Sequence, residues 1–133
     1  MNPIQPERVT ELLAADAYAA HLGIRVVGAD DTSVVVAMDL QPFHTNFLGG
    51  VHGGAVFSLA DAALSLISNA PGPRAVAIDT HLVLTGAAEV GETLTAVAEE
   101  TSRGRTLATY RITVRRDDGR VVGVFTGTVF IQG

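Results

Sequence analysis

Apolar residues recur with two different periods along the chain, and the change of period separates helices from strands. Residues 7–20 carry Val9, Leu12, Leu13 and Ala17 at helical spacing, which predicts a short amphipathic helix. Elsewhere apolar and polar residues alternate, a pattern typical of strands that are buried on one face. The alternation predicts six strands, at 22–29, 32–40, 75–85, 92–101, 105–116 and 120–131.

The segment 55–67 follows neither amphipathic pattern. It is rich in alanine and leucine and apolar nearly all round, which is typical of a helix buried inside a fold. A loop with several glycines, 41–54, precedes it, and Asn69 and Pro71 end it. The order is therefore one helix, two strands, a buried helix and four strands. An α+β fold with an antiparallel sheet wrapped around one central helix accounts for this order best.

Two dipeptides that begin with aspartate predict how neighbouring strands connect. Asp30-Asp31 separates the first two predicted strands, and Asp118-Gly119 separates the last two. Asp-Gly between alternating segments is a strong signal for a hairpin with a two-residue loop. We therefore expect the last two strands to be antiparallel neighbours.

The composition restricts the possible chemistry. A chain of 133 residues, 47% hydrophobic and 17% charged, is expected to fold as one domain spanning 1–133. Cysteine is absent, which excludes disulfides and thiolate chemistry. The N-terminus has no apolar run behind a basic start, and 55–67 is too short to span a bilayer. These features predict a cytoplasmic protein that does not associate with membranes.

Charge argues against nucleic-acid binding, since the formal net charge is −5 and the pI about 5.2. All nine basic residues are arginines, which excludes lysine Schiff-base chemistry, and six of the nine lie within 103–120. They are either solvated strand residues or a local anion site. The turn Arg103-Gly104-Arg105-Thr106 is the candidate for such a site, because planar guanidinium groups suit phosphate oxygens.

Asp61 is the residue that most needs an explanation. A carboxylate buried alone in an apolar helix would cost several kcal/mol. It either bonds to the backbone or a nearby serine, or it lines a pocket as a general base or nucleophile. Gly53 and Gly54 lie where the helix begins and backbone N–H groups lack partners. Such N–H groups can form an oxyanion hole for a carbonyl that gains negative charge.

The run from His44 to Gly54, HTNFLGGVHGG, and the following Leu59-Ala60-Asp61 closely resemble hotdog-fold thioesterases of the phenylacetate-degradation (PaaI) type. The resemblance covers nearly the whole chain. It implies the hotdog fold and hydrolysis of acyl-CoA esters, with aryl or arylacetyl groups favoured. It also implies that no metal or redox cofactor is needed, CoA being part of the substrate, and that homodimers pair into tetramers.

The resemblance assigns roles by position. Asp61 matches the catalytic carboxylate, as nucleophile or as base for water, and Gly53 matches the amide that polarises the thioester carbonyl. Asn46 and His52 match residues that position water or substrate. One departure concerns 84–87, where relatives often carry Arg-Pro. Further substrate contacts are predicted at Gly54, Thr80, Arg103, Arg105 and Thr106.

Other interpretations of the same residues compete with this one. A hotdog dehydratase or hydratase would use His52 and Asp61 as an acid–base pair, and a non-catalytic acyl-CoA-binding module would only bind the ester. Asp79 and His81 have a spacing that suits metal ligands, but no third ligand is evident, so an exposed or subunit-facing pair is favoured. His44 is interpreted as structural or as a surface residue.

Helix length predicts the assembly. Gly53 and Asp61 are eight residues apart, and a helix rises about 1.5 Å per residue, so they stand roughly 12 Å apart along one axis. Attack requires the nucleophile within about 3 Å of the carbonyl that the oxyanion donor holds. One helix cannot supply both groups, whereas two antiparallel helices across a two-fold axis can. We therefore expect a homodimer that shares its active sites.

Overall fold

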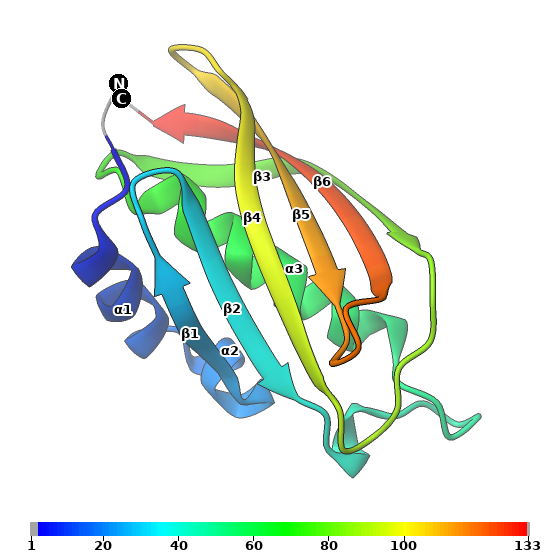
Figure 1. The fold of residues 1–133 in the computed structure, drawn as a ribbon. Helices are drawn as coiled ribbons and strands as arrows, with labels where there is room; N and C mark the ends of the chain where they lie inside the picture. Colours follow the sequence, from blue (N-terminus) through cyan, green and yellow to red (C-terminus); the bar gives the residue numbers. More distant parts are fainter. Residues whose placement is uncertain (1–2, 133) are drawn as a thin grey trace.

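A six-stranded antiparallel sheet curves around one long helix in the computed structural model, which describes residues 3–132 (Figure 1). The strand order is β1-β2-β4-β5-β6-β3. The α+β prediction, with one helix wrapped by a sheet, is confirmed. The elements are α1 (Pro6–Ala14), α2 (Ala17–Leu22), β1 (Ile24–Ala29), β2 (Ser33–Asp39), the 3-10 turn Pro42–His44, α3 (Gly53–Asn69), β3 (Arg74–Leu84), β4 (Thr93–Arg103), β5 (Leu107–Arg115) and β6 (Val121–Gln132).

The helix α3 forms the centre of the core. Leu59, Ala60 and Ala63 are fully buried, and α3 contacts all the strands from β2 to β6. A Cβ atom on Gly127 of β6 would lie 2.7 Å from Leu64 Cδ2, so Leu64 packs where β6 has no side chain. Burying each leucine of this kind contributes about 1.5–3 kcal/mol. Within the described residues, no helix has the length and apolarity that a membrane span needs.

The predicted helix at 7–20 is two helices, and the reason is local. The side chain of Asp16 accepts a hydrogen bond from the Ala19 N–H at 3.0 Å and caps a new helix start. α1 therefore ends at Ala14, and α2 begins at Ala17. Both short helices contact β1 and α3, which brings the residues around Asp16 to the central helix.

The turn between β5 and β6 is longer than predicted. Arg116 N–H donates to the Arg120 carbonyl at 3.0 Å, so three residues close the hairpin instead of two. Gly119 has a φ of +85°, a conformation that a side chain would disfavour. The Asp118 carboxylate accepts from the Arg116 guanidinium at 2.9 Å and from the Arg120 N–H at 3.0 Å. These two hydrogen bonds lower the pKa of Asp118 to about 2.

The strand β3 is a long free edge of the sheet. It pairs with β6 alone, and no described strand lies on its other side. Its exposed side chains include Ile78 (59%), Val83 (47%) and Leu84 (53%). An edge that exposes apolar side chains and unpaired backbone groups is a template for pairing with another chain.

Candidate active site

The start of α3 presents one backbone N–H without an acceptor. His52 is the N-cap, and its Nδ1 accepts from the Gly54 N–H at 2.8 Å. The Ala55 N–H donates to the His52 carbonyl at 2.9 Å. Among residues 3–132 the Gly53 N–H has no acceptor. Gly53 is therefore the candidate oxyanion donor, and the Gly54 amide, which we expected to contact substrate, is already occupied.

The ring of His52 also explains why residue 54 is glycine. A Cβ atom on Gly54 would lie 2.9 Å from His52 Nδ1, closer than such atoms approach. Because Nδ1 accepts a hydrogen bond, the neutral ring carries its proton on Nε2. His52 is exposed, so this N–H is available to a ligand. The prediction that His52 positions water or substrate remains compatible with this geometry.

A hollow of about 300 Å3 opens beside Gly53. Asn46 lines it, and the side-chain oxygen Oδ1 of Asn46 accepts from the Leu48 N–H at 2.9 Å, which holds the loop. A Cβ atom on Gly53 would lie 3.0 Å from Leu84 Cδ1. The segment that departs from the family pattern, 84–87, thus forms an uncharged wall of this hollow. Its full lining is Asn46, Gly50, Val51, Gly53, Val56, Leu84, Gly86, Ala87, Ala88 and Val122.

His44 is a buried structural residue and not a surface one. Its Nδ1 accepts from the Gln41 N–H at 2.9 Å, and its Nε2 bonds to the Leu22 carbonyl at 3.0 Å. The side chain is 2% exposed. His44 therefore ties the loop that leads to Gly53 to the end of α2.

Asp61 lies on the face of α3 that is turned away from the sheet. Its carboxylate is half-buried and has no hydrogen-bond partner among the described residues. Burial raises the pKa of Asp61, and the charge of Asp16 raises it further. A carboxylate held by the backbone or by a neighbouring serine would have such a partner. The contact with the backbone or a serine that the structural interpretation required is therefore absent among the described residues.

Gly53 and Asp61 do not meet within one chain. Eight residues of helix separate them by about 12 Å along the axis and about 80° around it. Gly53 faces the hollow beside Leu84, whereas Asp61 lies on the side of Asp16. The two halves of the predicted site are present on every chain, but on different faces of α3.

The comparisons decide the family. Residues 48–123 match the model of the thioesterase superfamily. The chain belongs to that superfamily. An Escherichia coli relative, named acyl-coenzyme A thioesterase PaaI, is 33% identical over 84% of this chain and 80% of its own length. A Deinococcus radiodurans protein named as an esterase is 44% identical over 93% of this chain and 85% of its own length.

Solved structures agree with this assignment. The E. coli PaaI protein superimposes with a TM-score of 0.91, at 30% identity, over 96% of this chain and 92% of that one. A thioesterase protein of Streptococcus pneumoniae, solved with coenzyme A, gives a TM-score of 0.86 at 26% identity, over 93% and 97%. The prediction of a PaaI-type hotdog thioesterase is confirmed.

In this thioesterase the arginine turn is only partly free to bind a ligand. Arg103 donates to Glu100 Oε1 at 3.2 Å and to the Tyr110 hydroxyl at 3.1 Å. The Tyr110 hydroxyl donates to Glu100 Oε1 at 3.2 Å. Burial raises the pKa of Tyr110 to about 12, with the charge of Glu100 adding to it. Arg103 is thus committed to this cluster. Arg105 is exposed and makes no ion pair among residues 3–132.

The turn also lies far from Gly53 of its own chain. β4 begins at Thr93, which bonds to Asp39 near the loop that leads to Gly53, and β4 ends at Arg103. The exposed Thr106 follows at that far end, where its carbonyl accepts from the Ile131 N–H at 2.7 Å. A substrate held at Gly53 could therefore contact this turn only if the turn belonged to a second chain or if the substrate were long and extended.

This difference between the two arginines gives a testable prediction. If Arg105 binds the CoA phosphates, Arg105→Ala is expected to raise KM for an aryl-CoA ester about threefold to tenfold, because that contact would be lost. It should leave KM for the matching pantetheine thioester unchanged, since that substrate lacks the nucleotide. Arg103→Ala, the matched control, should instead lower the Tm by breaking the contacts with Glu100 and Tyr110. Equal KM changes for both substrates in Arg105→Ala would contradict a phosphate contact.

Three residues that the sequence analysis did not single out lie beside Asp61. Ser58 is three residues earlier on the same helix face, and its Oγ bonds to the Tyr18 hydroxyl at 3.1 Å. Asp16, two residues before Tyr18, is close enough to raise the pKa of Asp61. The spacing of Ser58 from Asp61 was readable in the sequence. The approach of α2 was not, because it depends on the tertiary fold.

The remaining candidate residues lie on β3. Asp79 and His81 are exposed on the outer face of the sheet, as the favoured interpretation predicted. Thr80 points to the other face and pairs with Gly127, against which Leu64 packs. Thr80 thus lies level with the helical turn that follows Asp61.

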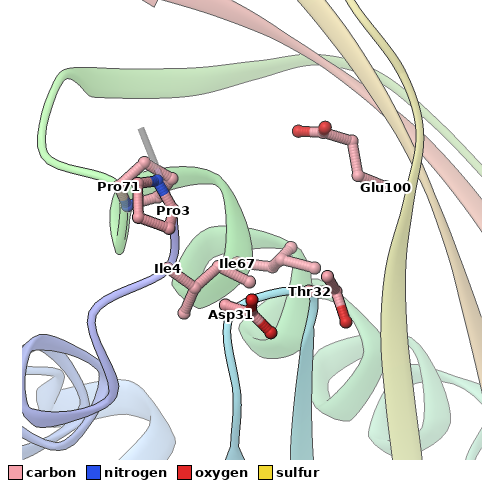
Figure 2. A pocket seen from close by; sticks show the side chains of 7 residues that line it. All are labelled: Pro3, Ile4, Asp31, Thr32, Ile67, Pro71 and Glu100. Carbon is pink, nitrogen blue, oxygen red and sulfur yellow. The ribbon is translucent and has the colours of Figure 1, made fainter. Parts of the chain in front are cut away.

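A separate hollow of about 290 Å3 lies at the other end of α3 (Figure 2). None of the predicted site residues lines it. Its two carboxylates, Asp31 and Glu100, would repel the phosphates of CoA. The lining comes from the N-terminal segment, the β1–β2 turn, the end of α3 and β4: Pro3, Ile4, Asp31, Thr32, Ile67, Pro71 and Glu100.

Proposed function

We propose that this thioesterase hydrolyses acyl-CoA thioesters, using Asp61 as nucleophile or general base and the Gly53 amide as oxyanion donor. The observation that carries the proposal is a pair of groups on α3 that no described residue hydrogen-bonds: a half-buried carboxylate whose pKa is raised by burial, and a backbone N–H at the helix start. The name of E. coli PaaI and the coenzyme A in the S. pneumoniae structure support the substrate class.

Both roles of Asp61 require its ionised form. As a base, the carboxylate takes a proton from water while the water oxygen attacks the thioester carbonyl carbon. As a nucleophile, it attacks that carbon itself, and water then hydrolyses the anhydride. In either route the carbonyl oxygen gains negative charge, which the Gly53 N–H and the positive end of α3 stabilise. The C–S bond then breaks, and CoA leaves as a thiolate that takes up a proton.

We further propose a homodimer in which Gly53 of one chain and Asp61 of the other form each site. The free edge of β3 and its exposed Ile78, Val83 and Leu84 provide a surface for a second copy. The loop before α3 adds Phe47 and Leu48, which are 96% and 80% exposed. The dimers are proposed to pair into tetramers.

For the acyl group we propose aryl or arylacetyl. The E. coli structure comes from a phenylacetic acid degradation operon, which supports this choice by relationship. Of the aromatic residues near the start of α3, Phe57 packs on Phe125 at 5.3 Å and belongs to the core. Phe43 is 60% exposed beside His44 and lines a third hollow with Tyr18 and His52. An aromatic wall of this kind suits a flat acyl group.

A panel of CoA esters tests this function. Purified protein is expected to release free CoA thiol from acyl-CoA esters, and fastest from phenylacetyl- or benzoyl-CoA. A hydratase would add water to an enoyl-CoA without releasing CoA, and a binding module would bind the esters without turnover. Either of these results, in folded dimeric protein, would reject thioester hydrolysis.

A further inference from the structure

Serine hydroxyls inside helices usually bond to the carbonyl four residues earlier. Ser68 of α3 does so, donating to the Leu64 carbonyl at 2.7 Å. Ser58 behaves differently, because its Oγ bonds at 3.1 Å to the hydroxyl of Tyr18, which lies on α2 and forty residues earlier in the chain. Among the described residues, Ser58 is the one serine of α3 whose hydroxyl bonds to another element.

The position of Ser58 connects two parts of the candidate site. It lies three residues before Asp61, which places the two Cβ atoms about 5–6 Å apart on one helix face. Ser58 also lines a hollow of about 210 Å3 together with Tyr18, His52 and Gly54. Its hydroxyl is therefore between the His52 cap and the carboxylate.

The Tyr18 contact fixes the position of the Ser58 oxygen. Either hydroxyl can be the donor in this contact. Whichever one donates, Ser58 Oγ keeps a further hydrogen-bonding site, because a serine hydroxyl can both donate and accept. A water molecule beside Asp61 can occupy this site. α2 itself is held there by Asp16, which caps it.

We infer that Ser58 is a positioning residue, whose hydroxyl is fixed by Tyr18 and orients the water that Asp61 activates. The inference rests on the proposed function of Asp61. It assigns a catalytic purpose to the packing of α2 on α3, because α2 places the Tyr18 hydroxyl against Ser58.

Substitutions at position 58 test this inference. Ser58→Ala is expected to lower kcat for the best CoA ester about tenfold, with KM changed less than twofold, because orientation is lost while binding remains. Ser58→Thr, which keeps the hydroxyl, should restore most of the rate. The matched control is Ser65→Ala, four residues past Asp61 on the exposed side of α3; it should keep full kcat. An unchanged kcat in Ser58→Ala would overturn the inference.

A double-mutant cycle tests the route through Tyr18. Tyr18→Phe keeps the ring and should lower kcat about threefold to fivefold. The double variant should be no slower than Ser58→Ala alone, because Tyr18 acts through that hydroxyl. Multiplying effects would reject the coupling. Melting curves identify loss of rate caused by unfolding, and Asp61→Asn tests the underlying function separately: if it remains active, the proposed function fails first.

Discussion

Asp61→Asn is expected to reduce kcat by a factor of about a hundred or more while CoA-ester binding is retained. The substitution keeps the size of the side chain and removes the charge and the basicity that both catalytic routes need. Steady-state CoA release and binding of a non-hydrolysable CoA thioether measure the two quantities separately. A folded Asp61→Asn protein with near-normal turnover would contradict the role of Asp61.

The same variant should be more stable at neutral pH, and the pH dependence identifies the cause. Because burial raises the pKa of Asp61 in the folded chain, the protonated form is favoured by folding. The folded protein therefore loses stability as pH rises from the ordinary Asp pKa through the raised one. Asparagine has no such penalty. The Tm of Asp61→Asn should exceed that of the wild type by a few degrees at pH 7, and the difference should disappear in acid.

A mixture of two inactive variants should regain activity if the site is shared. Asp61→Asn removes the carboxylate. Gly53→Val places a side chain against Leu84 Cδ1, which already lies 3.0 Å from a Cβ built there, and obstructs the amide. After subunit exchange, each mixed dimer has one site with both groups intact and one with neither. With random mixing, half of the dimers are mixed and carry one site each, so about a quarter of wild-type activity is expected.

The control for this experiment is the same mixture before subunit exchange, which should remain inactive. Exchange itself is measured independently with differently tagged chains. Mixed dimers that form and stay inactive would contradict the shared site, and so would a stable monomer with full turnover. Because Leu84 ends in a flexible side chain, Gly53→Val is expected to fold, and its melting curve verifies this.

The strands were predictable because their alternation reflects burial on one side of a sheet. Their observed bounds differ from the predicted ones by at most two residues. The division of the first helix was missed because one side chain, that of Asp16, outweighs the helical spacing of Val9, Leu12 and Leu13. The prediction for the last turn was wrong by one residue because Arg116 pairs with Arg120, which places Asp117 in the loop together with Asp118 and Gly119.

The site was predictable where its chemistry is local to one helix. Gly53 follows from the unpaired amides at a helix start, and Asp61 from a charge among apolar residues. The residues of α2 that lie near Asp61 could not be predicted, because no spacing rule connects Tyr18 to Ser58. The hydrogen bonds from Arg103 to Glu100 and Tyr110 could not be predicted for a related reason. The sequence does not show which residues of a hairpin compete with a ligand for the same guanidinium.

The cap at the start of α3 has a consequence for how this sequence can diverge. The ring of His52 occupies the space where a side chain of residue 54 would lie. A lineage that keeps the histidine ring in this cap must therefore keep Gly54, whatever selection acts on the substrate. Position 54 becomes free to vary once His52 is exchanged for a smaller cap or its ring turns away from residue 54. The two codons form one evolutionary unit, in which the order of substitution is set by a steric contact.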